Sequence, residues 1–374
     1  MTDFTTLPDL ASRRLGGGVV WANDELFAAA DNLVDPAPPR FQPKSFGPKG
    51  QIYDGWETRR RREPGYDYAI VRLGAPGVVR GVVIDTAYFT GNYPPQASVE
   101  GCGVEGYPNS AELAEAPWFP LLPKVALAGD TRNSFAVDEQ QRVTHVRLSI
   151  YPDGGVARLR VHGEVVADPR LLALLPIDLA ALEHGAHVAA CSNMFYGSPK
   201  NLLMPGLAGT MGEGWETARR RDESNDWVLI RLAVPGRVRL AELDTSHFKG
   251  NAPGRAALRG IDARAGELDD ADAWFDLLPG TRLQPDTRHR FATVAAPAAT
   301  HVRLDVYPDG GMARLRLFGV PSETELAELA ARWFNLLPPA QALSVLTGLA
   351  PEDARLLVDS RPVTAADLPA QLWQ

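Results

Sequence analysis

Alternating apolar and polar residues are the clearest pattern along the chain. In residues 145–151, HVRLSIY, every second side chain is apolar, which predicts a strand with a buried face and an exposed face that carries His145 and Arg147. Glycine and proline bound several further segments of this kind. Additional strands are predicted over residues 68–73, 78–86, 227–232 and 238–245.

A hairpin follows directly from this pattern. Residues 152–155, PDGG, are turn formers, and residues 157–161, ARLRV, return as a strand with Arg158 and Arg160 on the exposed face. Short antiparallel strands, long loops and few helical segments are typical of a β-sandwich or jelly roll. The predicted fold class is therefore all-β.

The chain contains this pattern twice. Residues 55–95 align without a gap on residues 214–254, and 20 of the 41 positions are identical. The hairpin of residues 144–163 recurs at residues 300–319, THVRLDVYPDGGMARLRLFG. A period this long indicates duplication of a whole domain rather than a repeat array.

The duplication predicts four parts. The repeats are expected over residues 1–166 and 184–320, and the first has a longer, proline-rich loop at residues 35–50. Residues 167–183 are expected to be a helical connector. Residues 321–374 are expected to be a helical tail that begins at a capping box, with Ser322 followed three residues later by a glutamate.

Composition and charge mainly exclude some classes of partner and location. The formal charge of −8 over 374 residues disfavours nucleic acid and anionic membranes as partners. The two cysteines, Cys102 and Cys191, lie at different places in the two copies, so we expect no disulfide and a reducing, cytoplasmic location. The N-terminal sequence has no signal-peptide pattern, and no apolar run is long enough to cross a membrane.

One recurring block combines an aromatic residue, a carboxylate and arginines before a strand. It reads GWETRRRR from residue 55 and GWETARRR from residue 214, and such groups suit a small ligand with a carboxylate and N–H groups. Alternatively, the tryptophans fill the sandwich end, and the arginines are solvated or pair with Asp67 and Asp226. The candidate catalytic residues here are Glu57 and Glu216, and the candidate substrate-binding residues are Trp56, Arg60, Arg61, Trp215, Arg219 and Arg220.

A second block follows a strand, DTAYFTGNYP from residue 85 and DTSHFKGNAP from residue 244. An acid at a strand end is well placed to face a cleft, although capping of an Asx-type turn is the structural alternative. The candidate acids or bases are Asp85 and Asp244, and the candidate hydrogen-bond donors are Asn92 and Asn251.

The copies differ at one position of this block. Tyr88 in the first copy aligns with His247 in the second, and a histidine beside an aspartate can transfer protons near neutral pH. A structural role for this histidine is the alternative. His184 and His187 lack the further ligands of a zinc site, and His145 and His301 are predicted on an exposed strand face.

These strings resemble the allantoicase family. The resemblance runs from residue 10 to about residue 319 and also includes LASRRLGGGVVWANDELF from residue 10 and CSNMFYGSPKNLLMPG from residue 191. It implies a galactose-binding-like jelly roll in each repeat. It also implies a hydrolase that cleaves a C–N bond of a linear ureido compound, converting allantoate and water to ureidoglycolate and urea in purine breakdown.

The implied reaction assigns hypothetical roles. An elimination followed by hydration needs an acid, a base and a guanidinium for the substrate carboxylate. We expect Glu216, Asp244 and His247, or their equivalents Glu57 and Asp85, to include the acid and base. Residues 60–62 or 219–221 would hold the carboxylate. No cofactor is predicted, no metal-ligand spacing is visible, and dependence on a divalent metal is left open.

Two other function classes remain open from the sequence. A jelly roll of this kind can be a non-catalytic module that binds a carbohydrate or another small ligand. A duplicated sandwich can also serve as an oligomerisation protein, and we expect a homo-oligomer in either case. Release of urea from allantoate distinguishes the enzyme from both.

Overall fold

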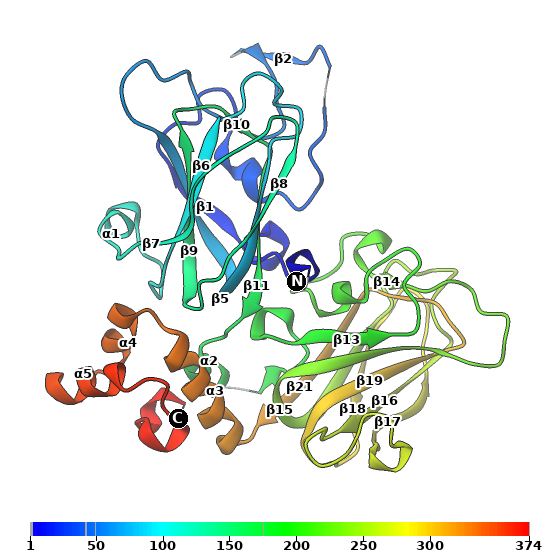
Figure 1. Cartoon of the computed structure of the whole chain (residues 1–374). Helices are drawn as coiled ribbons and strands as arrows, with labels where there is room; N and C mark the ends of the chain where they lie inside the picture. The colour runs from blue at the N-terminus through cyan, green and yellow to red at the C-terminus, as the bar shows by residue number, and fades with distance from the viewer. Residues whose placement is uncertain (1–2, 42, 49, 175, 374) are drawn as a thin grey trace. The chain divides into compact units, whose positions relative to one another are not determined.

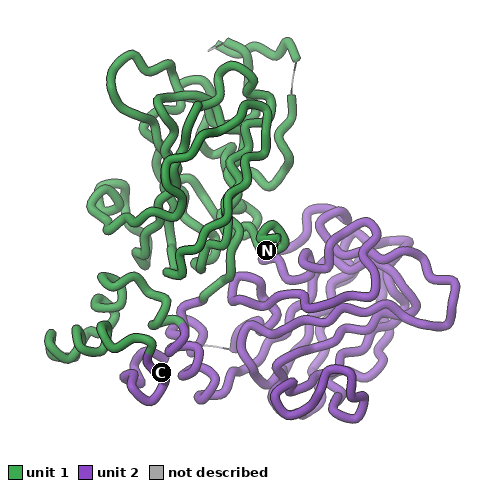
Figure 2. Tube along the Cα trace, viewed as in Figure 1, with its two compact units in different colours: residues 1–166, 333–362 green, residues 167–332, 363–374 purple. Residues whose placement is uncertain are grey.

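The computed structural model describes residues 3–41, 43–48, 50–174 and 176–373. The chain forms two compact units (Figure 2). The first comprises Met1–Val166 and Trp333–Pro362, and the second comprises Ala167–Arg332 and Val363–Gln374. No described helix has the length and apolar character needed to cross a membrane.

The first unit is built on a seven-stranded sheet around the long strand β5 (Figure 1). The first half of β5 pairs with β1 and β9, and its second half pairs with β8 and β11, so that one strand contributes to both layers of a sandwich. The strands of this sheet are β1 (Gly18–Ala22), β5 (Asp67–Asp85), β6 (Gln96–Cys102), β7 (Phe119–Ala126), β8 (Arg132–Ala136), β9 (Arg142–Tyr151) and β11 (Arg158–Val165). Short elements surround it: η1 (Phe4–Thr6), η2 (Arg13–Leu15), η3 (Ala30–Val34), β2 (Phe46–Gly47), β3 (Gly50–Gln51), β4 (Trp56–Glu57), α1 (Ser110–Ala114) and β10 (Gly155–Val156).

The second unit repeats this topology around β15. Its sheet contains β12 (Ile177–Asp178), β13 (His187–Cys191), β15 (Asp226–Asp244), β16 (Arg255–Ile261), β17 (Phe275–Arg282), β18 (Arg288–Ala292), β19 (Ala299–Tyr307) and β21 (Arg314–Pro321). The short elements are η4 (Leu182–His184), η5 (Pro199–Leu203), η6 (Met211–Glu213), β14 (Trp215–Glu216), η7 (Ala271–Ala273) and β20 (Gly311–Met312). The prediction of a duplicated β-sandwich is confirmed, although the two strands predicted at 68–73 and 78–86 are one continuous strand.

The segment between the repeats is only partly helical. α2 (Pro169–Leu172) is a single turn, and β12 then joins the sheet of the second repeat by pairing with β21. Pro176 separates the two, and proline cannot continue a helix because it lacks the N–H donor. The predicted helical connector is therefore wrong beyond its first turn.

The C-terminal tail is helical, as predicted. Its elements are α3 (Glu323–Leu336), α4 (Pro339–Val345), α5 (Pro351–Asp359), η8 (Ala365–Asp367) and η9 (Ala370–Leu372). The Oγ of Ser322 accepts the N–H of Glu325 at 3.3 Å, which is one half of the expected capping box. Within the first unit, Gln341 on α4 donates to Glu105 at 2.8 Å, and this carboxylate also binds the buried Arg142.

The face of β9 predicted to be exposed is covered instead. His145 and Ser149 are each 1% exposed, and β6 brings Cys102 opposite His145. Cys102, Ile70 and Leu113 of α1 form an apolar cluster with Trp118 packed against it. Burial lowers the pKa of His145 to about 4, so this histidine is neutral in the folded protein.

The buried histidine predicts a specific pH dependence. The folded-state pKa of His145 is about 4 against 6.5 for a free histidine, so the unfolded chain binds a proton that the folded chain rejects. Stability is therefore lost as the pH falls from about 6.5 to about 4. The loss amounts to about 3 kcal/mol. Denaturant unfolding at several pH values should show that His145→Phe removes this component.

His301 is the matched control for this experiment. It occupies the same position in the second repeat and burial also lowers its pKa, but it is only half-buried. His301→Phe should therefore change the pH dependence less than His145→Phe does. Equal effects of the two substitutions, or none from His145→Phe, would show that burial of His145 does not control this titration.

Candidate active site

The tryptophans of the first recurring block are structural anchors. Trp56 and Trp215 are fully buried, and their Nε1 atoms donate to the carbonyls of Asp24 and Asn193 at 2.8 and 2.9 Å. Their strands pair with the glycine-rich hairpin, β4 with β10 and β14 with β20. These contacts fix the backbone of the glutamate that follows each tryptophan.

The structure brings the two predicted blocks together through a glutamate–asparagine hydrogen bond. Asn92 donates to Glu57 at 2.7 Å, and Asn251 donates to Glu216 at 2.5 Å. Burial raises the pKa of Glu57, and the hydrogen bond from Asn92 only partly opposes this effect. A glutamate that holds its proton more tightly than usual is suited to act as a general acid.

The arginine run has a different environment. Arg61 pairs with Asp67 and Arg220 with Asp226, at 2.7 and 2.8 Å, and both aspartates are almost fully buried. These are the pairings given above as the structural alternative. The remaining predicted arginines, Arg60 and Arg219, have exposed side chains.

Asp85 and Asp244 end the central strands β5 and β15. One carboxylate oxygen of each caps an Asx-type turn, since Asp85 accepts the N–H of Ala87 at 2.9 Å and Asp244 accepts that of Ser246 at 2.8 Å. The predicted turn capping is therefore present. The other oxygen of Asp244, Oδ2, is buried and has no hydrogen-bond partner within the described part of the chain.

An arginine lies on each side of these aspartates, and sequence reasoning missed both. In the first repeat, Arg132 on β8 and Arg158 on β11 are the cross-strand partners of Asp85. In the second repeat, Arg288 and Arg314 flank Asp244 in the same register. Cross-strand partners project from the same face of a sheet, so each repeat has an Arg–Asp–Arg row. Recurrence of DTR at 130–132 and 286–288, and of ARLR at 157–160 and 313–316, could have revealed it.

The second arginine of each row, Arg158 on β11 or Arg314 on β21, is buried. The prediction that Arg158 lies on an exposed face of the hairpin is therefore wrong. Arg158 is 1% exposed and Arg314 is 3% exposed. Arg158 donates to the carbonyls of Ala37 and Asp54, and its guanidinium pairs with the Asp54 carboxylate at 2.8 Å. The sequence pattern could not show that the loop before β4 covers this face.

Two backbone-strained residues lie beside each row. Tyr88 and Asp130 have φ angles of 68° and 48°, and the Tyr88 N–H donates to the Asp130 carboxylate at 2.7 Å. His247 and Asp286 repeat this arrangement with φ angles of 72° and 49° and the same 2.7 Å bond. Positive φ is unfavourable for residues other than glycine, and such strain concentrates at functional sites.

His247 has a defined tautomer. Its Nε2 lies 2.9 Å from the carbonyl oxygen of Ala208, which can only accept a hydrogen bond. Nε2 therefore carries a proton, and in the neutral ring Nδ1 has the lone pair that can accept another. Tyr88 at the same place in the first repeat offers a hydroxyl instead.

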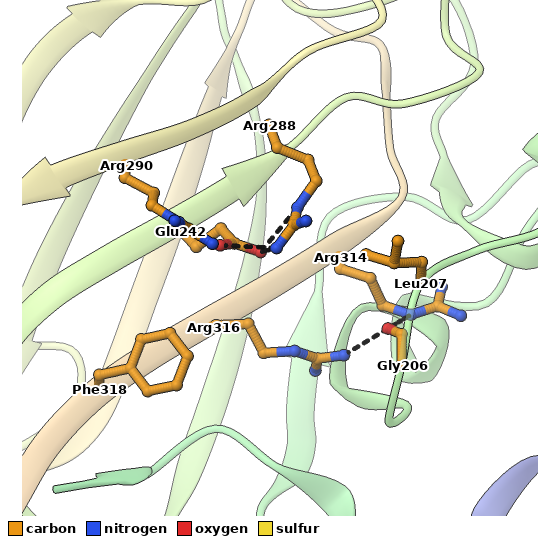
Figure 3. Close-up of a pocket in the computed structure, with 8 residues that line it drawn as sticks. All are labelled: Gly206, Leu207, Glu242, Arg288, Arg290, Arg314, Arg316 and Phe318. Atoms are coloured by element: carbon orange, nitrogen blue, oxygen red, sulfur yellow. Dashed lines mark hydrogen bonds and ion pairs between the residues drawn. The ribbon is translucent and has the colours of Figure 1, made fainter.

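Each row borders a cavity. The cavity of the first repeat has a volume of about 420 Å³ and is lined by Pro36, Pro38, Pro39, Asp85, Ala87, Tyr88, Asp130, Thr131, Arg132 and Arg160. That of the second repeat has a volume of about 290 Å³ and is lined by Gly206, Leu207, Glu242, Arg288, Arg290, Arg314, Arg316 and Phe318 (Figure 3). The described residues include no group of three or more histidines, cysteines or carboxylates arranged to hold a metal ion.

The buried ion pairs of the arginine run predict an effect on stability. Arg61→Gln leaves the carboxylate of Asp67 buried without its cation, which should lower the free energy of unfolding by about 2 kcal/mol. Denaturant unfolding measures this loss. Arg220→Gln should behave alike, and Arg60→Gln is the exposed control that should change stability by less than about 0.5 kcal/mol. An Arg61→Gln protein as stable as the control would contradict the structural role.

Comparison with known proteins identifies the family. The family model described as "Allantoicase repeat" matches residues 8–166 and 177–322. A probable allantoicase of Nocardia farcinica is 59% identical over 84% of this chain and 95% of its own length, and one of Streptomyces coelicolor is 50% identical over 88% and 89%. The crystal structure of allantoicase from Saccharomyces cerevisiae is 34% identical with a TM-score of 0.69, over 84% of this chain and 93% of its own. The chain belongs to the allantoicase family.

Proposed function

We propose that this protein hydrolyses allantoate to ureidoglycolate and urea, a step of purine breakdown. The observation that carries the proposal is the match to the allantoicase repeat along both halves of the chain. The geometry adds, in each repeat, a buried aspartate whose two cross-strand partners are arginines, next to strained residues. A carbohydrate-binding module does not require such a row.

The reaction defines what the site must supply. Allantoate carries one carboxylate and two ureido groups on the same carbon, and the bond from that carbon to one ureido nitrogen is broken. A base removes the N–H proton of the retained ureido group as an acid protonates the departing nitrogen, which leaves as urea. Water then adds across the resulting C=N bond and gives ureidoglycolate.

The acid and base are proposed among the recurring carboxylates. Glu57 is supported as the acid by the burial that raises its pKa, and Asp85 is supported as the base because it lines the cavity of the first repeat. Glu216, Asp244 and His247 are the equivalents in the second repeat, where Nδ1 of His247 is available as a base.

The other proposed residues have more indirect support. Asn92 and Asn251 hold the glutamates, and the buried Trp56 and Trp215 fix the backbone next to those glutamates. Arg60, Arg61, Arg219 and Arg220 stay proposed carboxylate ligands. Arg132 has better support in the first repeat because it lines the cavity beside Asp85.

The cellular setting is also a proposal. We place the enzyme in the cytoplasm, with support from Cys102 and Cys191, which are free thiols. We propose a homo-oligomer that binds neither nucleic acid nor membrane, and the acidic net charge supports the second part.

Urea release tests the activity directly. Purified protein incubated with allantoate should release urea and ureidoglycolate in equal amounts, because one C–N bond is cleaved per molecule. The assay should be run after chelation and again with added divalent metal, which also determines whether a metal is required. No urea above background in either condition would reject the enzyme and leave the binding module as the explanation.

The duplication provides matched variants for the acid and base. Asp85→Asn and Asp244→Asn remove the equivalent carboxylate in the two repeats. His247→Gln tests the histidine that the second repeat has in place of Tyr88. Loss of an acid or base should lower kcat by about 10² to 10⁴-fold. A wild-type rate of urea release in all three variants would show that these roles are wrong.

A further inference from the structure

The two repeats differ in the row next to the Arg–Asp–Arg row. Two residues earlier on the central strand, Glu242 of β15 has Arg290 and Arg316 as its cross-strand partners. In the first repeat the same position of β5 is Val83, and its partners are Ser134 and Arg160. The second repeat therefore has a carboxylate that the first lacks, on the face that borders the cavity.

This additional carboxylate binds the two exposed arginines of the second repeat, Arg288 and Arg290. Glu242 is 4% exposed, and its Oε1 and Oε2 accept from Nη2 of Arg288 at 2.8 and 3.0 Å. Nε of Arg290 donates to Oε2 at 2.8 Å (Figure 3). Burial favours the protonated acid, but the hydrogen bonds from both arginines outweigh it and hold the pKa of Glu242 below its usual value.

Arg132, the equivalent of Arg288 in the first repeat, is available to bind a ligand. Arg132 has an exposed side chain, which makes no hydrogen bond or ion pair within the described residues. It lines the larger cavity together with Asp85, whereas Asp244 does not line the cavity of its own repeat. The first repeat thus presents an unpaired guanidinium to solvent at the place where the second repeat presents one bound to Glu242.

We propose that Glu242 is a built-in carboxylate that fills the anion site of the second repeat, so that a small carboxylate with a ureido group binds only at Arg132 of the first repeat. This inference rests on the proposed function for its choice of ligand. It implies one substrate site per chain, in the first repeat, next to the proposed base Asp85. In that repeat the ureido N–H groups can donate to Asp85 and Asp130, which line the same cavity.

The test measures binding without turnover. Hydantoate has the carboxylate and one ureido group of allantoate but lacks the second ureido group, so that no urea can be eliminated, and its binding to the full chain can be titrated by calorimetry. We expect one equivalent per chain. Arg132→Gln should weaken this binding by at least about tenfold, as expected for loss of a charged hydrogen bond. Arg288→Gln, the matched control, should leave both affinity and stoichiometry unchanged.

Glu242→Gln provides the converse test. Removing the built-in charge should open the second site, so that hydantoate binds with two equivalents per chain. If this variant fails to fold, the matched arginine pair still decides, because Arg132 and Arg288 both have exposed side chains. Two equivalents in the wild type, or loss of binding in Arg288→Gln but not in Arg132→Gln, would overturn the proposal.

The outcome is separable from that of the proposed function. Urea release from allantoate with binding lost in Arg288→Gln would keep the activity and reject the role of Glu242. One equivalent of hydantoate that depends on Arg132, without any urea release, would keep the anion site and reject the activity.

Discussion

A buried guanidinium at the end of the central strand is the constraint on which the site depends. Arg158 and Asp85, and likewise Arg314 and Asp244, are cross-strand partners at the end of the longest strand of each repeat. A charge in this position needs hydrogen-bond acceptors, because desolvation without them is very unfavourable. The acceptors are carbonyls of the preceding loop, from Ala37 and Asp54 in the first repeat and from Gly206 and Glu213 in the second. The same charge thus orders two loops of different sequence and length.

The strained turns follow from the same arrangement. The chain leaves the central strand through an Asx-type turn on the aspartate, and the next residues must reach the loop before β8 or β18. Tyr88 and His247 do so at positive φ, with their N–H groups held by Asp130 and Asp286. A tyrosine and a histidine accept the same strained backbone, so the constraint acts on the main chain and leaves the side chain free to diverge.

The sequence allowed the duplication, the fold class and the family to be predicted, because each depends on long patterns that recur. It failed for the exposure of His145 and Arg158, since alternation distinguishes the two faces of a strand without showing what covers them. α1, which packs on Cys102 beside His145, is only five residues long, and the cover of Arg158 is an irregular loop. The sequence predicted the pairing of Arg61 with Asp67 as one alternative. It did not reveal the Arg–Asp–Arg row around Asp85, because the members of that row come from three strands far apart in the sequence.

Glu242 explains how the second repeat can keep the same sandwich fold without binding a carboxylate ligand. A cluster of arginines repels itself unless an anion is present, so an open site gains stability whenever ligand binds to the folded state. In the second repeat the anion belongs to the chain, and Arg288 and Arg290 share the carboxylate of Glu242, which lies 2.8 Å from each. In the first repeat Val83 supplies no carboxylate and Ser134 stands in place of Arg290, so that Arg132 alone is left to bind a ligand. Both repeats retain the buried arginine, its cross-strand aspartate and the strained turn, so these features preserve the sandwich end. What the exposed arginine binds, a ligand at Arg132 or Glu242 at Arg288, distinguishes a binding repeat from a supporting one.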